Sequence, residues 1–321
     1  GAYLLPLYYI TAPCYNKTMI YVATPGRYTE IDGYASCLAY ADLLNQRSKT
    51  ARTYLAAEPN YSVPGYLRIR ELENFSLNFK PDDEAIILDI SIPEVIHQYF
   101  PDDQILEIID HHSGFESYWR ERIGDKAIIE KIGAVATSIY EWWGECWDYA
   151  KMSPAIARLL LAAILDNTLN FNAVITTNRD RVAADHLAKL AGTTVTDFAT
   201  EYFSSVSQTI TGNLAKSIQN DHKPFHVPKL NLNIECAQLT LWDGKVLQGC
   251  TAEIYHEMNN LGKDWLCSVL SISDQSNYIL TNSSDVANYL TRVLGLQLRG
   301  DWFVSSRLWL RKEIFTKLLE D

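Results

Sequence analysis

Short hydrophobic runs alternate with helical patterns along the first part of the chain. The runs Met19–Thr24, Ala51–Ala56, Ala85–Ile90 and Ile105–Ile109 each predict a β-strand. Apolar residues at helical spacing over Ala35–Leu44 predict the first crossover helix. Because alternating strands and helices are typical of βαβ units, the pattern predicts an N-terminal α/β domain with a central parallel sheet.

Three more helices are predicted after these strands. Apolar residues recur at helical spacing over Val135–Trp143, Pro154–Leu165 and Asp180–Leu190. Pro154 stands where a helix can begin, because the first helical position needs no amide hydrogen. We expect these helices to cover the sheet.

A polar stretch between Ser204 and Lys229 predicts the connection between two domains. We place the boundary between residues 207 and 208, so that 1–207 form the first domain and 208–321 form a smaller second domain. We expect a flexible segment to join them. The residues that interrupt the apolar pattern are Gln208, Thr211, Gly212, Asn213, Gln219, Asn220, Asp221 and Pro224.

The second domain shows its own mixture of strand and helix patterns. Leu230–Leu241 and Trp265–Ile272 predict strands, and Ala252–Leu261 and Val286–Leu294 predict helices. This predicts a second, smaller α/β unit.

Composition and charge limit the classes of function. With 321 residues, 47% hydrophobic and 21% charged, the chain has the length for two domains and the balance of a folded protein. A formal charge of -11 argues against a nucleic acid duplex as partner, because such binding draws on clustered Lys and Arg. A small anionic substrate needs only a few cations in one pocket.

The cysteines and the apolar runs predict the compartment. Six cysteines are scattered without a CxxC pair, which favours reduced thiols and a cytoplasmic protein. The longest apolar run, Leu159 to Leu165, is too short to cross a bilayer, so no membrane association is expected. The N-terminus shows no positively charged region followed by an apolar stretch, so no signal peptide is expected.

Acidic and imidazole side chains stand where predicted strands end. Such groups are costly to bury without partners, and ligands of open parallel sheets bind beyond the carboxyl ends of the strands. A solvated loop is the alternative interpretation. The residues concerned are Asp110, His111 and His112 after one strand, Asp89 after another, Glu30 and Asp32 after the first, and Asp166 within an apolar helix.

These side chains suit a metal centre. Carboxylate oxygens combined with imidazole nitrogen favour Mn²⁺ or a similar first-row ion. Two such ions can activate a water and neutralise charge on a phosphoryl group.

The ordered segments resemble the DHH phosphoesterase superfamily, in its DHH–DHHA2 branch of manganese-dependent family II inorganic pyrophosphatases and exopolyphosphatases. This resemblance implies a parallel-sheet DHH domain flanked by helices, a smaller DHHA2-like α/β domain, and an active site in the interdomain cleft. It covers nearly the whole chain, through residues 30–43, 87–89, 108–112, 133–137 and 163–171.

The resemblance also implies roles for individual residues. Asp110 would orient an imidazole of the metal centre, and His112 would face the substrate phosphate and assist the leaving oxygen. Lys223 and Arg307 would bind phosphate. Arg311 belongs either to this basic set, with Lys312, or to an exposed face of the last helix. The implied metal ligands are Glu30, Asp32, Asp89, His111 and Asp166, with Asp89, Asp110 and His112 as the catalytic group.

The implied function is the hydrolysis of a phosphoanhydride, pyrophosphate or short polyphosphate, or of a small phosphate ester by metal-activated water. The implied cofactor is Mn²⁺, with Mg²⁺ or Co²⁺ as alternatives, in one or two ions. The partner is then a small anionic phosphate substrate, and a homodimer stays open.

Three departures from the family pattern keep an alternative open. Gly26 stands where the family has a metal-binding histidine, Ile90-Ser91 replaces the usual His-Asn, and Leu308 replaces a second basic residue. The alternative is a catalytically degenerate paralogue that binds a phosphate ligand or a partner protein.

Overall fold

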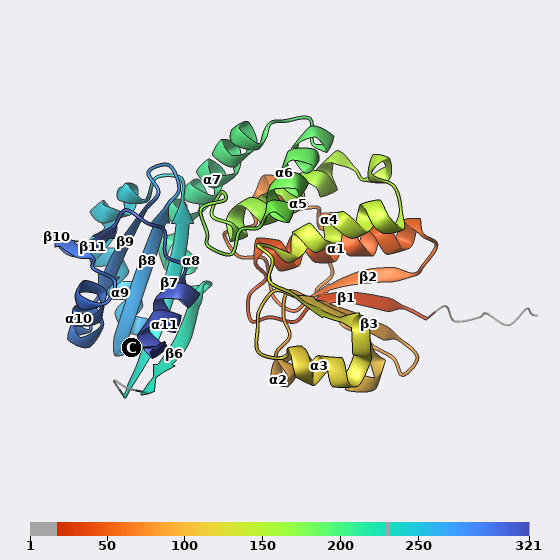
Figure 1. Cartoon of the computed structure of the whole chain (residues 1–321), viewed down its shortest axis with the longest axis horizontal. Coiled ribbons are helices and arrows are strands. Elements are labelled where there is room, and N and C mark those ends of the chain that lie inside the picture. Colours follow the sequence, from red (N-terminus) through yellow and green to blue (C-terminus); the bar gives the residue numbers. More distant parts are fainter. Residues whose placement is uncertain (1–17, 229–230, 321) are drawn as a thin grey trace, which may run out of the picture.

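A computed structural model describes residues 18–228 and 231–320 as two α/β lobes connected by helices (Figure 1). This confirms the predicted fold class with its two domains. The expectation about a signal peptide falls on residues 1–17, which lie outside the described residues, as does Cys14. None of the described helices is long and apolar enough to cross a membrane.

The first lobe is built on a five-stranded parallel sheet, which the alternation of strand and helix patterns predicted. The short strand β5 was not predicted, because three residues give too little pattern. In spatial order the strands are β2 (Ala51–Leu55), β1 (Ile20–Thr24), β3 (Glu84–Leu88), β4 (Ile105–Asp110) and β5 (Ala127–Ile129).

Helices cover both faces of this sheet, so alternate side chains of β1 enter different cores. Ile20 and Val22 pack with one hydrophobic cluster, whereas Tyr21 and Ala23 pack with another that contains Trp119. Both faces are therefore buried, as expected of a parallel sheet. In Figure 1, α1 (Ile31–Gln46), α4 (Val135–Cys146), α5 (Pro154–Asn167) and α6 (Asn178–Leu190) lie on one face, and α2 (Pro93–Ile96) and α3 (Glu116–Ile123) lie on the other.

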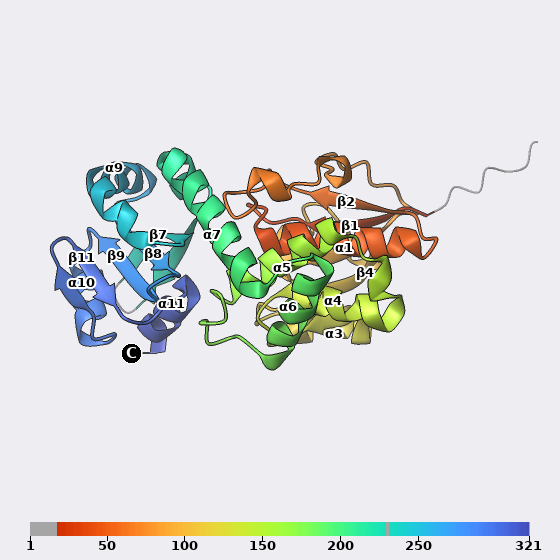
Figure 2. The same cartoon turned by 90° about the horizontal axis from the view of Figure 1, so that it is seen from above.

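The polar connection predicted as a flexible segment is helical instead. Helix α7 (Val195–Gly212) runs through the predicted boundary between residues 207 and 208, and α8 (Leu214–Gln219) follows directly. The hydroxyl of Thr211 donates to the carbonyl of Ser207, so polar side chains are satisfied within the helix. Figure 2 shows α7 lying between the two lobes.

The second lobe is a six-stranded mixed sheet with helices. The predicted strands β7 and β8 and the predicted helices α9 and α10 are confirmed, although Leu230 lies outside the described residues. Edge strand β6 pairs antiparallel with β7 and was not predicted. In spatial order the strands are β10 (Gln297–Arg299), β11 (Trp302–Ser305), β9 (Ser276–Thr281), β8 (Asp264–Ser271), β7 (Leu232–Leu241) and β6 (His222–Val227), with helices α9 (Thr251–Leu261), α10 (Ser284–Arg292) and α11 (Arg311–Glu320).

Candidate metal and phosphate site

Asp89 follows β3 directly and is held in a left-handed backbone conformation, with φ of +62°. Such a conformation is unfavourable for a residue other than glycine and often marks a functional site. The amide of Asp89 donates to the Ile109 carbonyl of β4 at 2.9 Å, which fixes the turn. The carboxylate atom Oδ1 is buried without a hydrogen-bond partner among the described residues.

His111 presents a neutral ring nitrogen to that carboxylate. Its Nδ1 lies 3.2 Å from the Ile132 carbonyl, and because a carbonyl can only accept, the proton is on Nδ1. The unprotonated Nε2 lies 3.6 Å from Asp89 Oδ1. Burial, together with the charges of His112 and Lys312, lowers the pKa of His111 to about 3. The ring is therefore ready to bind a metal ion.

Asp110 orients His112. Its Oδ1 accepts from Nδ1 of His112 at 2.8 Å and from the backbone amides of His111 and His112 at 2.7 and 3.1 Å. Burial alone would raise the pKa of Asp110, but the hydrogen bond and charge of His112 hold it below its ordinary value. The imidazole that Asp110 orients is thus that of His112, whereas Ile132 orients His111.

Asp89, His111 and His112 can converge on one ion. Their potential ligand atoms all lie within 4.8 Å of one another. A carboxylate oxygen combined with imidazole nitrogen suits a first-row transition ion. The unpaired Oδ1 of Asp89 shows that these residues fit such an ion, because a buried oxygen without a partner is unfavourable unless a ligand satisfies it.

Asp32 lies at the N-terminus of α4. Its two carboxylate oxygens accept from the amides of Val135 and Ala136, each at 2.8 Å. Burial raises the pKa of Asp32 to about 7 against these hydrogen bonds. Its charge also raises the pKa of Asp89, so the two carboxyl groups are close. Oδ1 also accepts from the Ser36 hydroxyl at 3.3 Å, whereas Oδ2 keeps a second lone pair for a metal ion.

Asp166 lies in an adjoining cavity of about 60 Å³, together with Glu30 and Asp221. The hydroxyl of Tyr202 donates to its Oδ1 at 3.0 Å. Burial raises the pKa of Asp166 to about 7, and the nearby charge of Glu30 adds to this effect. Asp166 is therefore near the other acidic groups but outside the cluster of Asp89, His111 and His112.

Contacts between the lobes bring Lys223, for which a phosphate-binding role is predicted, close to Glu30. The Lys223 ammonium lies 3.3 Å from Glu30 Oε1 and holds the pKa of Glu30 below its ordinary value despite burial. Arg27 Nη2 lies 3.4 Å from Nε2 of His222. The Tyr61 hydroxyl donates to the Asp221 carboxylate. No local pattern in the sequence marked Tyr61 or His222 for these roles.

Arg307 does not reach this site. Its guanidinium contacts Glu313 at 3.1 Å and stacks on the Trp309 ring at 3.8 Å, and it lines none of the cavities between the lobes that the structure describes. The predicted phosphate role of Arg307 is therefore not supported by its position.

The basic residues of α11 that approach the site are Arg311 and Lys312. Arg311 is buried, and its guanidinium binds the Asp221 carboxylate at 2.9 Å and the Cys236 carbonyl at 3.1 Å, so it holds β6 and β7 in place. Lys312 lines a cavity of about 220 Å³ together with His111 and His112. The sequence left open whether Arg311 and Lys312 belong to the phosphate-binding set or to an exposed face of the last helix.

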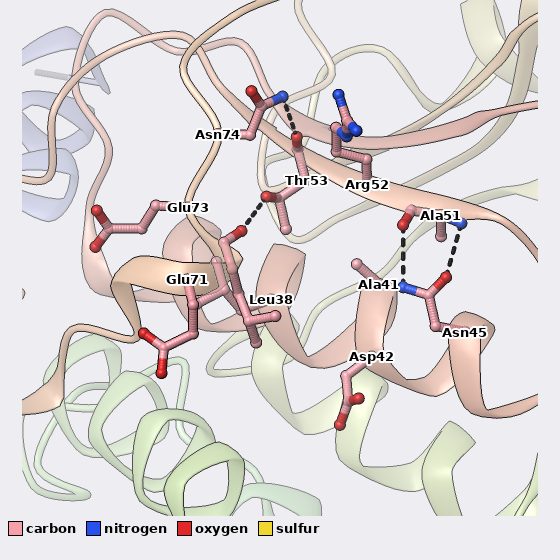
Figure 3. A pocket seen from close by; sticks show the side chains of 11 residues that line it. Leu38, Ala41, Asp42, Asn45, Ala51, Arg52, Thr53, Glu71, Glu73 and Asn74 are labelled. Carbon is pink, nitrogen blue, oxygen red and sulfur yellow. Dashed lines mark hydrogen bonds between the residues drawn. The ribbon is translucent and has the colours of Figure 1, made fainter.

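A cavity of about 450 Å³ joins these groups, with walls from both lobes. Asp89, Asp110 and His112 line it from the first lobe, and His222 and Lys223 line it from the second. A second hollow of about 380 Å³ beside the start of β2 holds no comparable cluster among the residues that Figure 3 draws.

No family model matches the chain. A probable manganese-dependent inorganic pyrophosphatase of Deinococcus radiodurans is 24% identical over 288 residues, covering 84% of this chain and 88% of the relative. The manganese-dependent inorganic pyrophosphatase of Bacillus subtilis is 25% identical over 234 residues, covering 70% and 72% of the two chains.

Two solved structures share the fold. A candidate family II inorganic pyrophosphatase of Methanococcus jannaschii has a TM-score of 0.67 at 19% identity, covering 94% of this chain and 98% of its own. An exopolyphosphatase-related protein of Bacteroides fragilis has a TM-score of 0.52 at 11% identity, covering 95% and 92%.

The chain has a two-lobed α/β fold that is similar to that of the family II pyrophosphatase-like structure, and its first lobe carries a carboxylate–histidine cluster. Its curated relatives are manganese-dependent inorganic pyrophosphatases, and this confirms the predicted resemblance to the DHH superfamily.

Proposed function

We propose that the protein is a metal-dependent phosphohydrolase that cleaves a phosphoanhydride or a small phosphate ester. The observation that carries the proposal is the buried, unpaired Oδ1 of Asp89, 3.6 Å from the neutral His111, in a cavity that also contains Lys223. The manganese-dependent relatives support the proposal, and the comparisons give nothing that favours a non-catalytic paralogue.

Mn²⁺ is the proposed metal ion. Asp89 and His111 would hold it, with Asp32 and Asp166 as nearby carboxylates. When bound, the ion would acidify a water and offset negative charge on the phosphoryl group. Glu30 is already neutralised by Lys223 and Gly26 offers no side chain, so we propose a single ion per chain.

The chain's own groups would bind and orient the phosphate. Asp110 fixes the ring of His112, which leaves Nε2 of His112 to contact the substrate phosphate or the leaving oxygen. The ammonium groups of Lys223 and Lys312 line the adjoining cavities and would attract phosphate oxygens.

The direct test is an anaerobic titration of the full chain with Mn²⁺, counting bound ions and measuring phosphate release from pyrophosphate and from methyl phosphate in the same samples. We expect one ion per chain and phosphate release that depends on it. Stoichiometric metal binding without release from either substrate would contradict the proposed activity, and release without metal would contradict the proposed centre.

Metal binding should depend on pH in a defined direction. Burial and neighbouring carboxylates raise the pKa of Asp89 well above its ordinary value and that of Asp166 to about 7, and burial raises the pKa of Asp32 to about 7. Because protons compete with the ion, Mn²⁺ affinity should increase as the pH rises from about 6 to about 8.

The raised pKa values of these carboxyl groups also predict how the stability of the metal-free chain depends on pH. The folded state keeps protons that the unfolded chain releases near pH 4, so the free energy of unfolding should fall, by about 1–4 kcal/mol per group, as the pH rises from about 4 through 7. Melting temperatures at pH 5 and pH 8, with and without Mn²⁺, check this. A metal-free melting temperature that is equal at both pH values would contradict it.

A further inference from the structure

The residues that line the cavity between the lobes form two sets. One set consists of the charged and imidazole groups around Asp89 and Lys223 described above. The other set is called here the apolar half of the lining, and it comes mainly from the turn after β3, from α2 and from the start of α3. Its members are Ile90, Ile92, Val95 and Phe115, with Tyr28 and Pro224 beside the charged set.

The apolar half is held in shape by the surrounding structure. The Trp119 indole donates to the Ser91 carbonyl at 2.7 Å, which fixes the turn between Ile90 and Ile92. Pro93 then begins α2. Ile90 and Phe115 pack against a hydrophobic core, whereas Ile92 is 42% exposed. The turn therefore presents an isoleucine to the cavity on a fixed backbone, and the folded core does not need that side chain for burial.

Pyrophosphate would not use such a wall. It is charged at both ends, so contact with Ile92 or Phe115 would cost hydration without a compensating hydrogen bond. The cavity of about 450 Å³ falls in the range of about 300–1,000 Å³ that is typical of pockets for organic ligands. A cavity whose lining combines apolar side chains with a cation, imidazole and carboxylates suits a ligand with one anionic end and one apolar end.

We propose that the substrate is a small phosphate monoester whose organic group is apolar or aromatic. This proposal rests on the proposed phosphohydrolase function. The phosphate lies among Asp89, His112 and Lys223, and the organic group lies against Ile92, Val95 and Phe115. The oxygen of water forms a bond to phosphorus while the bond from phosphorus to the ester oxygen breaks. One proton of the water goes to the leaving oxygen, so the products are an alcohol and inorganic phosphate.

The experiment compares benzyl phosphate with methyl phosphate on the full chain loaded with Mn²⁺, with pyrophosphate as a third substrate. Both esters release an alcohol of similar acidity, so a difference in kcat/KM reports contacts with the organic group. We expect benzyl phosphate to be preferred by about tenfold or more, the effect of burying a phenyl group. Calorimetric binding of benzylphosphonate and methylphosphonate gives a second readout, and the same preference is expected there.

A matched pair of variants locates the preference. Ile92→Ser should lower the ratio of benzyl to methyl phosphate by about threefold to tenfold, because it removes apolar surface from the wall. Val182→Ser changes an apolar residue of α6 that is 56% exposed and lines none of the cavities described above, and it should leave the ratio unchanged. Both variants alter one solvent-exposed side chain, so both should fold.

The outcomes separate the two proposals. Equal kcat/KM for the two esters, a preference for pyrophosphate over both, or equal effects of Ile92→Ser and Val182→Ser would overturn the inference about the ester while the phosphohydrolase function stands. If no phosphate is released from any of the three substrates although Mn²⁺ binds, the proposed function fails and the inference fails with it.

Discussion

Two cavities of similar size differ in what their polar groups do. In the hollow beside β2, of about 380 Å³, the Thr53 hydroxyl donates to the Leu72 carbonyl and the Asn45 side chain bonds to the Ala51 backbone in both directions (Figure 3). Local backbone groups satisfy these side chains. In the cavity between the lobes, of about 450 Å³, the carboxylate of Asp89 keeps an oxygen without a partner.

The difference shows that unpaired polar atoms identify a ligand site better than volume does. Asp89 Oδ1 lines the cavity between the lobes and is buried without a hydrogen-bond partner among the described residues, whereas the nearby Ser91 hydroxyl interacts with the Asp110 carboxyl group. Folded proteins rarely leave such atoms unsatisfied, so a ligand is the economical explanation. Cavity size alone would have given both hollows equal weight.

The largest expected effect comes from replacing one carboxyl group in each cavity. Asp89→Asn should lower phosphate release by about a hundredfold or more, because it removes a proposed metal ligand. Asp42→Asn is the matched control, since Asp42 lines the hollow beside β2 and burial also raises the pKa of its carboxyl group. It should leave phosphate release within about twofold. Steady-state kinetics and Mn²⁺ counting on both variants check the comparison.

Thermal unfolding in the absence of metal separates loss of the site from loss of the fold. Asp89→Asn should not lower the melting temperature of the metal-free chain, because it removes a buried charge among like charges. If activity survives Asp89→Asn, or if Asp42→Asn is equally damaging, the contrast between the two cavities fails.

The second effect concerns the cation that the second lobe supplies. Lys223→Gln removes the partner of Glu30 and a proposed phosphate contact, so KM should rise by about tenfold or more. It should also allow a second Mn²⁺ ion to bind, since Glu30 becomes free. Lys245→Gln is the control, because Lys245 forms a similar exposed pair with Asp274 at 2.8 Å, remote from both cavities. Unchanged KM and metal count in Lys223→Gln would contradict the assigned role.

Local patterns in the sequence predicted the first sheet, because buried parallel strands are continuous apolar runs. They also predicted the end of β4, because polar residues interrupt the apolar run there. The polar pattern over α7, in contrast, was wrongly interpreted as a flexible connection. The hydroxyls of α7 bond to carbonyls of the preceding turn, and Tyr202, Val206 and Ile210 form a buried stripe that the polar residues between them obscured.

The sequence predicted candidate site residues that directly follow a strand. It did not predict which residues of the second lobe lie at the cavity between the lobes. Asp89 and His111 come together because β3 and β4 are neighbours, which the sequence order suggested. Lys312 replaces Arg307 at the site because α11 begins only at Arg311 and turns its first residues toward His111. Tertiary packing determines which residue of a basic segment faces a cavity. The spacing of residues along the chain does not contain this information.

The smallest expected effect concerns a hydrogen-bonded contact between the lobes and whether activity depends on it. Tyr61→Phe removes a hydroxyl that bonds to Asp221 and, at 2.6 Å, to the Gln238 carbonyl of the second lobe. Tyr34→Phe removes a hydroxyl that donates to Glu73 at 2.8 Å and accepts from the Ile69 amide at 3.0 Å, both within the first lobe. Each change leaves a polar partner unsatisfied, so each should lower the free energy of unfolding by about 1–2 kcal/mol.

Only Tyr61→Phe should also raise KM, by about twofold to fivefold, because Asp221 lies two residues before Lys223 and the hydroxyl ties this segment to the first lobe. Chemical denaturation gives the stability of both variants, and steady-state kinetics give KM. Equal losses of stability with a change in KM for Tyr61→Phe alone would show that the second lobe acts through its placement over the metal-binding edge. Equal KM values in both variants would mean that Lys223 reaches the site without help from this contact, and the cavity between the lobes would then depend on the ion pair with Glu30 instead.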